Sequence, residues 1–372
     1  MSRWRRITCV PVSLCAVKKR AVIGAAIMFV VLATRPIAEC AVADDDAWLA
    51  GRPQPWTRRE RPILSALTTK QAWAKVTLYS PHVIRMNGVY KMWYVGNASA
   101  TRRPDLVIGY ATSRDGIDWT PYKQNPILTL KDLPWGSFWQ TPCVRYDADE
   151  RVYKMWFTSL SDTKTNDEGR LISGVQQLGY ATSDDGIRWK IRARPIFPYG
   201  RSPCVIKEGA GKYRMWMNSG PLKDGKHSGL FRYIYEFAST DGIRWKQAPR
   251  PAIAPSGLIR TVVYPYVVRR GERYFMWYGG HVAGGRFELF CAESADGSTW
   301  KTDHQRPAFP AATDKNRFDG RYTSTPCVVP ESDRMLLFYS ARDLSNEYLD
   351  GEGKTRRDGA GVYQHIGVAT HP

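Results

Sequence analysis

Five short apolar segments, each centred on a proline, recur along the chain at nearly constant intervals. They read YSPHVI, QTPCVRY, RSPCVIK, VYPYVVR and STPCVVP, and their prolines are Pro81, Pro142, Pro203, Pro265 and Pro326. The intervals between these prolines are 61, 61, 62 and 61 residues. Self-similarity at a fixed period is the sequence signature of a repeat architecture. The chain is therefore predicted to contain five copies of one structural unit.

Each proline segment begins a pattern of four short β-strands. An aromatic-rich segment follows it, as in YKMWYVGN and YKMWFTS. A third segment then ends in an Asp-Gly turn, as in GYATSRDGIDW, and a fourth ends in a motif such as NPIL or RPIF. Asp-Gly between two strands is typical of a tight β-hairpin, because glycine accepts a positive φ. Four antiparallel strands per repeat predict an all-β fold, a five-bladed β-propeller.

The fifth repeat stops before its fourth strand, at the sequence HIGVATHP. The missing piece occurs near the other end of the chain, where residues 56–64 read WTRRERPIL and match residues 119–128 and 189–197. We therefore expect the N-terminal strand to complete the last blade, which closes the ring and removes an open sheet edge. On this interpretation residues 44–372 form a single propeller domain.

Residues 1–43 have the three zones of an export signal. Basic residues precede an apolar run over residues 21–33, and Ala41-Val42-Ala43 forms a small-x-small cleavage site. The run of 13 apolar residues is shorter than the roughly 20 that a transmembrane helix needs, so a retained anchor is the weaker alternative. We expect residues 1–43 to be a signal peptide and the mature protein to be secreted or periplasmic, without a stable membrane span.

Charge and cysteine content narrow the expected partners. The signal segment holds seven of the 54 Lys and Arg and one of the 35 Asp and Glu, so the remainder keeps 47 basic against 34 acidic residues, a net charge of +13. For an exported protein this excess favours an acidic polysaccharide over nucleic acid, although a generally basic soluble surface explains it equally well. The four cysteines beyond residue 43 are too widely spaced for a disulfide framework or a zinc ribbon.

Strand direction alternates within a blade, so the starts of the first strands and the ends of the second strands share one face of the disc, here called the mouth. The Asp-Gly turns lie on the opposite face, where repetition indicates a turn device rather than chemistry. Nine of the 14 tryptophans recur at fixed repeat positions and are expected to pack the blades. Trp73, Trp135 and Trp139 instead lie in connections that reach the mouth. Their rings are expected either to stack on a sugar or to cap the blade ends.

These motifs resemble the five-bladed glycosidases of glycoside hydrolase families 43 and 32 and the related family 130. The resemblance covers about residues 56–372 and rests on the repeated ATSxDGxxW turn, the following NPIL-type strand and the proline-containing first strands. It implies hydrolysis of glycosidic bonds by acidic residues at the starts of those strands, one as base or nucleophile and another as acid. None of those positions holds Asp or Glu in this sequence, so the family's catalytic residues do not carry over.

Three interpretations of the site remain open, and the first is an enzyme with displaced carboxylates. Asp319 and Asp343, in the mouth connections of the fifth blade, are its first candidates. Glu236 is a further candidate on a third strand, where other blades have glycine. Asp132 and Asp162 lie near the second blade and are also within reach of the mouth by topology.

The other two interpretations need no catalytic carboxylate. A glycan-binding propeller would use aromatic and polar residues of the mouth and channel. The residues expected to contact sugar are Trp73, Trp135, Trp139, Gln140, His82, Arg201, His281 and Arg321. A metal site would use one layer of side chains around the axis, formed by His82, Cys143, Cys204, Tyr266 and Cys327.

The expected function is that of a secreted carbohydrate-active protein, a glycoside hydrolase acting on an extracellular or envelope glycan. The alternative is a non-catalytic glycan-binding propeller. The expected partner is an oligo- or polysaccharide, and the net charge is compatible with an acidic one. We expect no cofactor, no metal and no nucleic acid, and we expect the protein to act as a monomer.

Overall fold

The computed structural model describes residues 55–371 apart from 99–105, 166–170, 224–225, 228–230, 346, 350–353 and 358–362. The signal peptide expected at residues 1–43 lies outside this range and stays a prediction. Within the described residues, no helix is both long enough and apolar enough to cross a bilayer.

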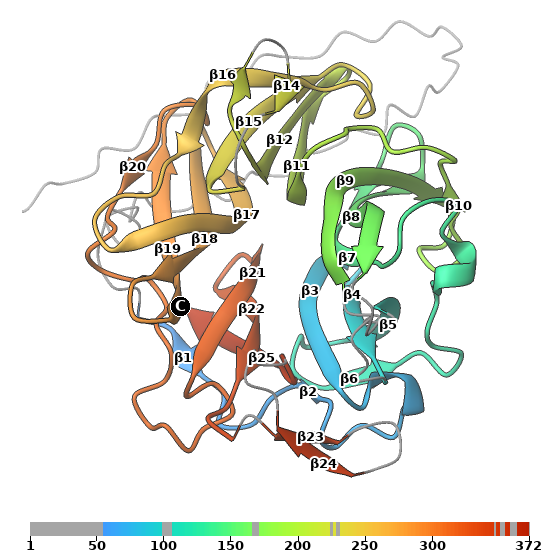
Figure 1. The fold of residues 1–372 in the computed structure, drawn as a ribbon, viewed down its shortest axis with the longest axis vertical. Helices are drawn as coiled ribbons and strands as arrows, with labels where there is room; N and C mark the ends of the chain where they lie inside the picture. The colour runs from blue at the N-terminus through green and yellow to red at the C-terminus, as the bar shows by residue number, and fades with distance from the viewer. Residues whose placement is uncertain are drawn as a thin grey trace, which may run out of the picture. The chain divides into compact units, whose positions relative to one another are not determined.

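Five antiparallel sheets stand around a common axis, with the five proline-containing strands innermost (Figure 1). Blades 1 and 2 consist of β3 (Thr77–Met86), β4 (Val89–Asn97), β5 (Val107–Ser113), β6 (Trp119–Pro121), β7 (Gln140–Asp147), β8 (Val152–Thr165), β9 (Leu171–Ser183) and β10 (Lys190–Ile191). Blades 3 and 4 consist of β11 (Arg201–Gly209), β12 (Lys212–Ser219), β15 (Tyr233–Ser239), β16 (Lys246–Ile253), β17 (Ile259–Arg270), β18 (Arg273–Val282), β19 (Arg286–Ser294) and β20 (Lys301–Thr302). The prediction of an all-β, five-bladed propeller is confirmed.

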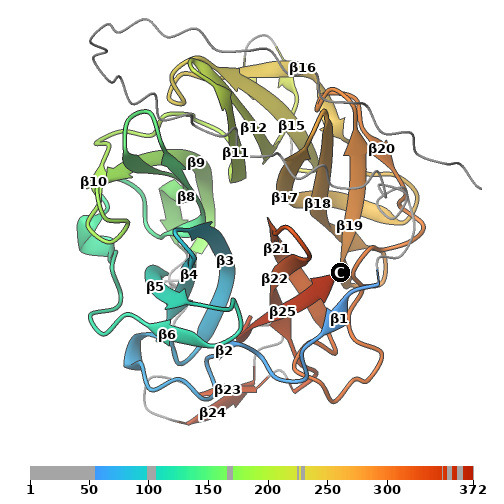
Figure 2. The same ribbon diagram turned by 180° about the vertical axis from the view of Figure 1, so that it is seen from behind.

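The fifth blade combines the two ends of the described chain. Its strands are β21 (Tyr322–Pro330), β22 (Met335–Arg342) and β25 (His365–His371), and both β1 (Thr57–Arg58) and β2 (Leu64–Ser65) pair with β25. Figure 2 shows β1 beside β25 from behind. Whether this short pairing closes the ring and stabilises the fifth blade stays a prediction, which deletion of the N-terminal strand would test.

The smaller elements belong to the connections between these strands. Two short hairpins, β13 (Leu222–Lys223) with β14 (Lys226–His227) and β23 (Glu347–Leu349) with β24 (Thr355–Arg357), follow the second strands of blades 3 and 5. Single 3-10 turns, η2 (Ala72–Ala74) and η3 (Leu130–Asp132), lie in the connections that enter blades 1 and 2.

Every innermost strand is bulged at its proline. The pairing register shifts there in all five blades, and the residue before the proline has a left-handed backbone, with φ between 44° and 58°. These residues are Ser80, Thr141, Ser202, Tyr264 and Thr325. A left-handed conformation is unfavourable for residues other than glycine, and most of all for a bulky one such as Tyr264. The propeller therefore holds a ring of five strained backbone positions around its axis.

The Asp-Gly turns connect neighbouring blades as well as neighbouring strands. The turn glycine has a positive φ in blades 1 to 4, and in blades 2 to 4 its carbonyl accepts hydrogen bonds from two indoles. In blade 2, Gly186 O accepts from Trp189 of its own turn at 3.2 Å and from Trp93 of blade 1 at 2.7 Å. Trp156 and Trp216 reach the turns of blades 3 and 4 in the same way. The repeated tryptophans are thus framework residues.

Candidate functional site

A small cavity lies on the axis at the level of the five bulges. Its volume is about 30 Å³, and it is lined by the left-handed residues, their prolines and the side chains of His82 and Tyr266. This volume holds one or two water molecules. A sugar ring does not fit into this cavity.

Three first strands present polar side chains to the mouth from the same repeat position, two residues before the proline. Tyr79 is buried there, and burial strongly raises the pKa of its hydroxyl, with a further contribution from Tyr264. A hydrogen bond from Gln140 and the charge of Arg201 act in the opposite direction. The neighbouring blades 1, 2 and 3 thus bring Tyr79, Gln140 and Arg201 together. The Oε1 atom of Gln140 is buried and has no hydrogen-bond partner.

The guanidinium of Arg201 is held in place by two neighbours. Its Nε donates to Asn218 Oδ1 at 2.7 Å, and its central carbon lies 6.0 Å from the centre of the Phe231 ring. Asn218 is itself fixed, because its amide donates to the carbonyls of Val262 and Tyr233. Among the residues that the structure describes, Arg201 has the hydrogen bond to Asn218 and no ion pair.

Two residues of blade 4 and one of blade 5 complete this part of the mouth. His281 lies at the end of β18 and contacts the edge of Phe287; partial burial and the charge of Arg201 lower the pKa of its imidazole. Tyr264 contacts the same Phe287 ring. Tyr363, just before β25, stacks on Tyr79 with ring centres 5.7 Å apart.

Sequence reasoning assigns no role to three of these residues. Tyr79 occupies the same repeat position as Gln140 and Arg201, two residues before the proline, and that position was the available signal. Tyr264 directly precedes its proline and is the bulge residue of blade 4. Tyr363 lies in a non-repetitive connection, and nothing in the sequence distinguishes it.

Asp343 lies at the mouth end of blade 5, immediately after β22. Its Oδ2 is 3.6 Å from His365 Nε2, and its Oδ1 accepts hydrogen bonds from the backbone N–H and the hydroxyl of Ser345. Burial would raise the pKa of Asp343, but the interactions with His365 and Ser345 outweigh it and lower the pKa. His365 is buried, and its Nδ1 pairs with Ser65 Oγ at 3.0 Å. Asp343 is therefore an ionised carboxylate, about one-fifth exposed, at neutral pH.

Asp319 is fully buried in an ion-pair network. Its Oδ2 accepts hydrogen bonds from Arg58 and the Tyr339 hydroxyl, both at 2.9 Å, and its Oδ1 accepts one from Arg317 at 3.0 Å. Arg58 belongs to β1, so this carboxylate ties the N-terminal strand to the connection that enters blade 5. Both of its oxygens are engaged within the protein.

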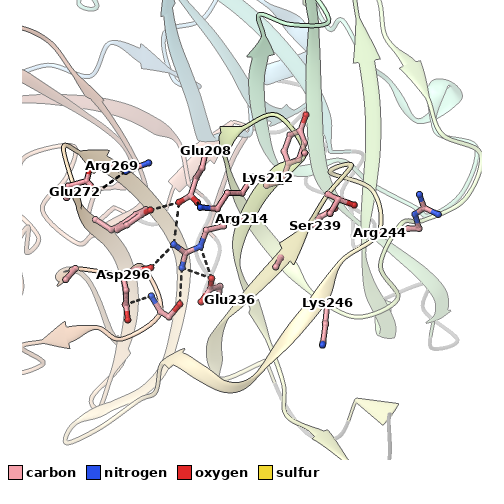
Figure 3. A pocket seen from close by; sticks show the side chains of 17 residues that line it. Glu208, Lys212, Arg214, Glu236, Ser239, Arg244, Lys246, Arg269, Glu272 and Asp296 are labelled. Atoms are coloured by element: carbon pink, nitrogen blue, oxygen red, sulfur yellow. Dashed lines mark hydrogen bonds and ion pairs between the residues drawn. The ribbon is translucent and has the colours of Figure 1, made fainter. Parts of the chain in front are cut away.

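Glu236 lies on the face opposite the mouth. It pairs with Arg214 at 2.6 Å in a pocket of about 690 Å³ between blades 3 and 4, whose walls include the turn residue Asp296 (Figure 3). Arg214 also contacts Glu208, which accepts a hydrogen bond from Tyr274 of the next blade. The structure therefore does not bring Glu236 together with Asp319 or Asp343.

The remaining carboxylate candidates lie outside the mouth cluster just described. Asp132 is exposed and caps the short helix η3, where its Oδ2 accepts hydrogen bonds from the backbone N–H and the hydroxyl of Thr129. The side chain of Asp162 is outside the described part of the chain.

The three mouth tryptophans differ in how much of the ring is covered. Trp139 is fully buried, donates to Thr129 O at 2.8 Å and packs on Phe157. Trp73 is partly buried between Tyr94 and the backbone of β4 and β5. Trp135 is partly exposed and also stacks on Phe157, with ring planes 17° apart. Trp139 thus has the capping role that the sequence left open, and Trp135 keeps the more accessible ring.

The layer of side chains that the sequence suggested as a metal site lies below the bulges. In the structure these side chains form hydrogen bonds between neighbouring blades. Cys143, Cys204 and Cys327 each accept a backbone N–H from the next blade, at 3.1 to 3.3 Å. His82 Nε2 pairs with Val144 O at 2.9 Å, and burial, together with the charge of Arg145, lowers its pKa to about 3. Among the described residues no group of three or more His, Cys, Asp and Glu side chains is arranged to hold a metal ion.

Arg321 lies at the start of blade 5, directly before β21. Its guanidinium stacks on Tyr322 at 5.3 Å, and the backbone N–H of Arg321 donates to Arg342 O. The structure thus groups Gln140, Arg201 and His281, whereas His82 lies deeper in the channel.

No protein-family model matches the chain. An uncharacterised protein of Mycobacterium tuberculosis strain H37Rv, Rv1502, is 31% identical over 155 residues, which is 41% of this chain and 47% of that protein. The protein MT1551 of M. tuberculosis strain CDC 1551 is 30% identical over 155 residues. The chain thus matches about half the length of these curated relatives.

Solved structures of similar fold include glycoside hydrolases. One belongs to a study of the GH130 family of mannoside phosphorylases, which contains glycoside hydrolases that target β-1,2-mannosidic linkages in Candida mannan (TM-score 0.63, 16% identity, 87% of this chain and 95% of that chain). A second is a glycosyl hydrolase from Bacteroides ovatus (TM-score 0.62, 17% identity, 86% of this chain and 95% of that chain). A third is the catalytic domain of a Coprinopsis cinerea GH62 α-L-arabinofuranosidase (TM-score 0.60, 12% identity, 86% of this chain and 97% of that chain). At these identities the likeness establishes the fold, and it confirms the resemblance to glycosidase propellers.

Proposed function

We propose that this protein is an exported glycoside hydrolase that binds a glycan at the mouth of the propeller. The observation that carries the proposal is the cluster of Tyr79, Gln140, Arg201 and His281 above a ring of five strained bulges. Backbone strain of this kind is found at ligand sites, where the surrounding structure maintains it. The glycosidase fold of the structural neighbours supports a glycan as the ligand.

Asp343 is the proposed catalytic carboxylate. It is the candidate that lies at the mouth, keeps partial exposure and is ionised at neutral pH. An ionised carboxylate suits a base that activates water or an anion that stabilises an oxocarbenium-like transition state. His365 is a positioning residue in this scheme, because it contacts Asp343 and is fixed by Ser65.

The second candidate function is glycan binding without hydrolysis. It is favoured by one specific observation, the absence of Asp and Glu from the residues that flank all five bulges. In this alternative the mouth cluster binds the sugar, and Asp343 has a structural role through its contacts with His365 and Ser345.

A hydrolysis and binding screen separates the two functions. The mature protein is incubated with a panel of neutral and acidic polysaccharides, and both bound glycan and released reducing ends are measured. If Asp343 is catalytic, Asp343→Asn lowers kcat/KM by about 10² to 10⁴ and leaves glycan affinity nearly unchanged. Asp118→Asn, an equivalent change on an exposed turn of the opposite face, is the matched control.

The results have distinct meanings. Equal turnover by parent and Asp343→Asn rejects the assigned carboxylate. Binding without turnover by the parent, across the whole panel, favours the non-catalytic propeller.

A further inference from the structure

We propose that the mouth selects glycans that carry a carboxylate group, such as chains containing uronic acid, and that Arg201 binds this group. The inference rests on the proposed function, since it names the substrate class of the same site. Arg201 occupies a ring position where the glycosidase resemblance implies an acid, so this position of the mouth has the opposite charge.

The guanidinium of Arg201 is held in an orientation that suits a planar ligand. Its Nε donates a hydrogen bond to Asn218, and the Phe231 ring lies beneath the guanidinium, so the plane of the group is fixed. The two terminal nitrogens have no partner among the described residues. A fixed guanidinium with free terminal nitrogens matches the two oxygens of a carboxylate in a bidentate pair.

The surroundings of Arg201 favour one negative charge over two. The guanidinium is partly buried and lacks an ionic partner in the described structure, and an uncompensated cation is costly away from water. A second positive charge on His281 is disfavoured, because partial burial and the charge of Arg201 lower the pKa of its imidazole. A carboxylate balances this single cation, whereas a phosphate carries nearly twice the charge.

Gln140 and Tyr79 supply neutral groups for the rest of the sugar. The unpartnered Oε1 of Gln140 is an acceptor suited to a sugar hydroxyl. The phenol of Tyr79 stays protonated, since burial raises its pKa. The site therefore combines one cation with uncharged polar groups.

Matched ligands test the inference. The mature protein is titrated with oligomers of galacturonate, mannuronate and glucuronate and with the methyl ester of each, which is neutral and otherwise identical. We expect at least one acid chain to bind about tenfold to a hundredfold more tightly than its ester, the size of a hydrogen-bonded charge pair. Arg201→Gln is expected to remove this difference, so that acid chain and ester bind the variant with equal affinity.

Two further variants control for charge and for folding. Arg188→Gln removes one positive charge from an exposed side chain on the Asp-Gly face and is expected to keep the full preference. Arg201→Lys retains the charge without the planar fork, and it is expected to keep a small part of the preference with the parent's thermal stability.

The outcomes separate this inference from the proposed function. Equal binding of acid chains and esters by the parent, or an undiminished preference in Arg201→Gln and Arg201→Lys, overturns the role of Arg201 and leaves glycan binding intact. A preference for phosphorylated chains over uronates also overturns it. Absence of binding to every acidic and neutral chain overturns the proposed function as well.

Discussion

At the scale of single residues, burial and ion pairing separate the carboxylates that a glycosidase would use from those that hold the fold. Asp319 and Asp343 both lie near the mouth by topology, and the sequence treats them alike. In the structure Asp319 has no exposed surface, forms ion pairs with two arginines and accepts a hydrogen bond from a tyrosine. Asp343 stays partly exposed. This difference in burial depends on the tertiary contact of Asp319 with Arg58, some 260 positions away in the sequence. It therefore cannot be predicted from the residues next to either aspartate.

The network around Asp319 leads to a prediction about stability. Asp319→Asn leaves Arg58 and Arg317 without their counter-charge, and breaking a buried ion pair in this way costs about 3–5 kcal/mol. We expect a loss of that size in the free energy of unfolding, measured by chemical denaturation. Asp343→Asn, at a partly exposed site, is the comparison and should cost clearly less. Equal denaturation midpoints for parent and Asp319→Asn would show that the network is not stabilising.

At the scale of elements, most of each blade could be predicted from the sequence, because its determinants are local and repeated. Proline marks the innermost strand, Asp-Gly marks the outer hairpin, and the turn glycines indeed have a positive φ. The bulge could not be predicted, since its left-handed residue is Ser, Thr or Tyr and none of these favours that conformation.

The pairing of β1 and β2 with β25 carries the element-scale prediction. Deleting residues 44–64 removes β1, Leu64 of β2 and the Arg58 contact to Asp319, and it exposes the edge of β25. We expect the free energy of unfolding to fall by several kcal/mol, a large share of a typical domain's total. Thermal unfolding of the truncated and the full mature protein is the measurement. Coincident transitions would show that the N-terminal strands do not stabilise the last blade.

At the scale of the whole molecule, the repeat predicts the ring and the two faces, but it predicts the site only in part. Gln140, Arg201 and His281 were foreseeable because strand polarity places them at the mouth. Trp139 was not distinguishable from Trp135, because which ring is covered depends on how both pack against Phe157. Tyr363 comes from a connection without periodicity, so only the folded chain places it on Tyr79.

The central claim is that glycan binds at the mouth and not on the Asp-Gly face, where the pocket of about 690 Å³ lies. The most direct test is the affinity of the best glycan from the panel for two variants, Gln140→Ala at the mouth and Lys246→Ala in the opposite pocket. We predict that Gln140→Ala weakens binding by about tenfold, the scale of a lost hydrogen bond that leaves a group unpaired, and that Lys246→Ala has the parent's affinity. Loss of binding in Lys246→Ala with full affinity in Gln140→Ala would contradict the account.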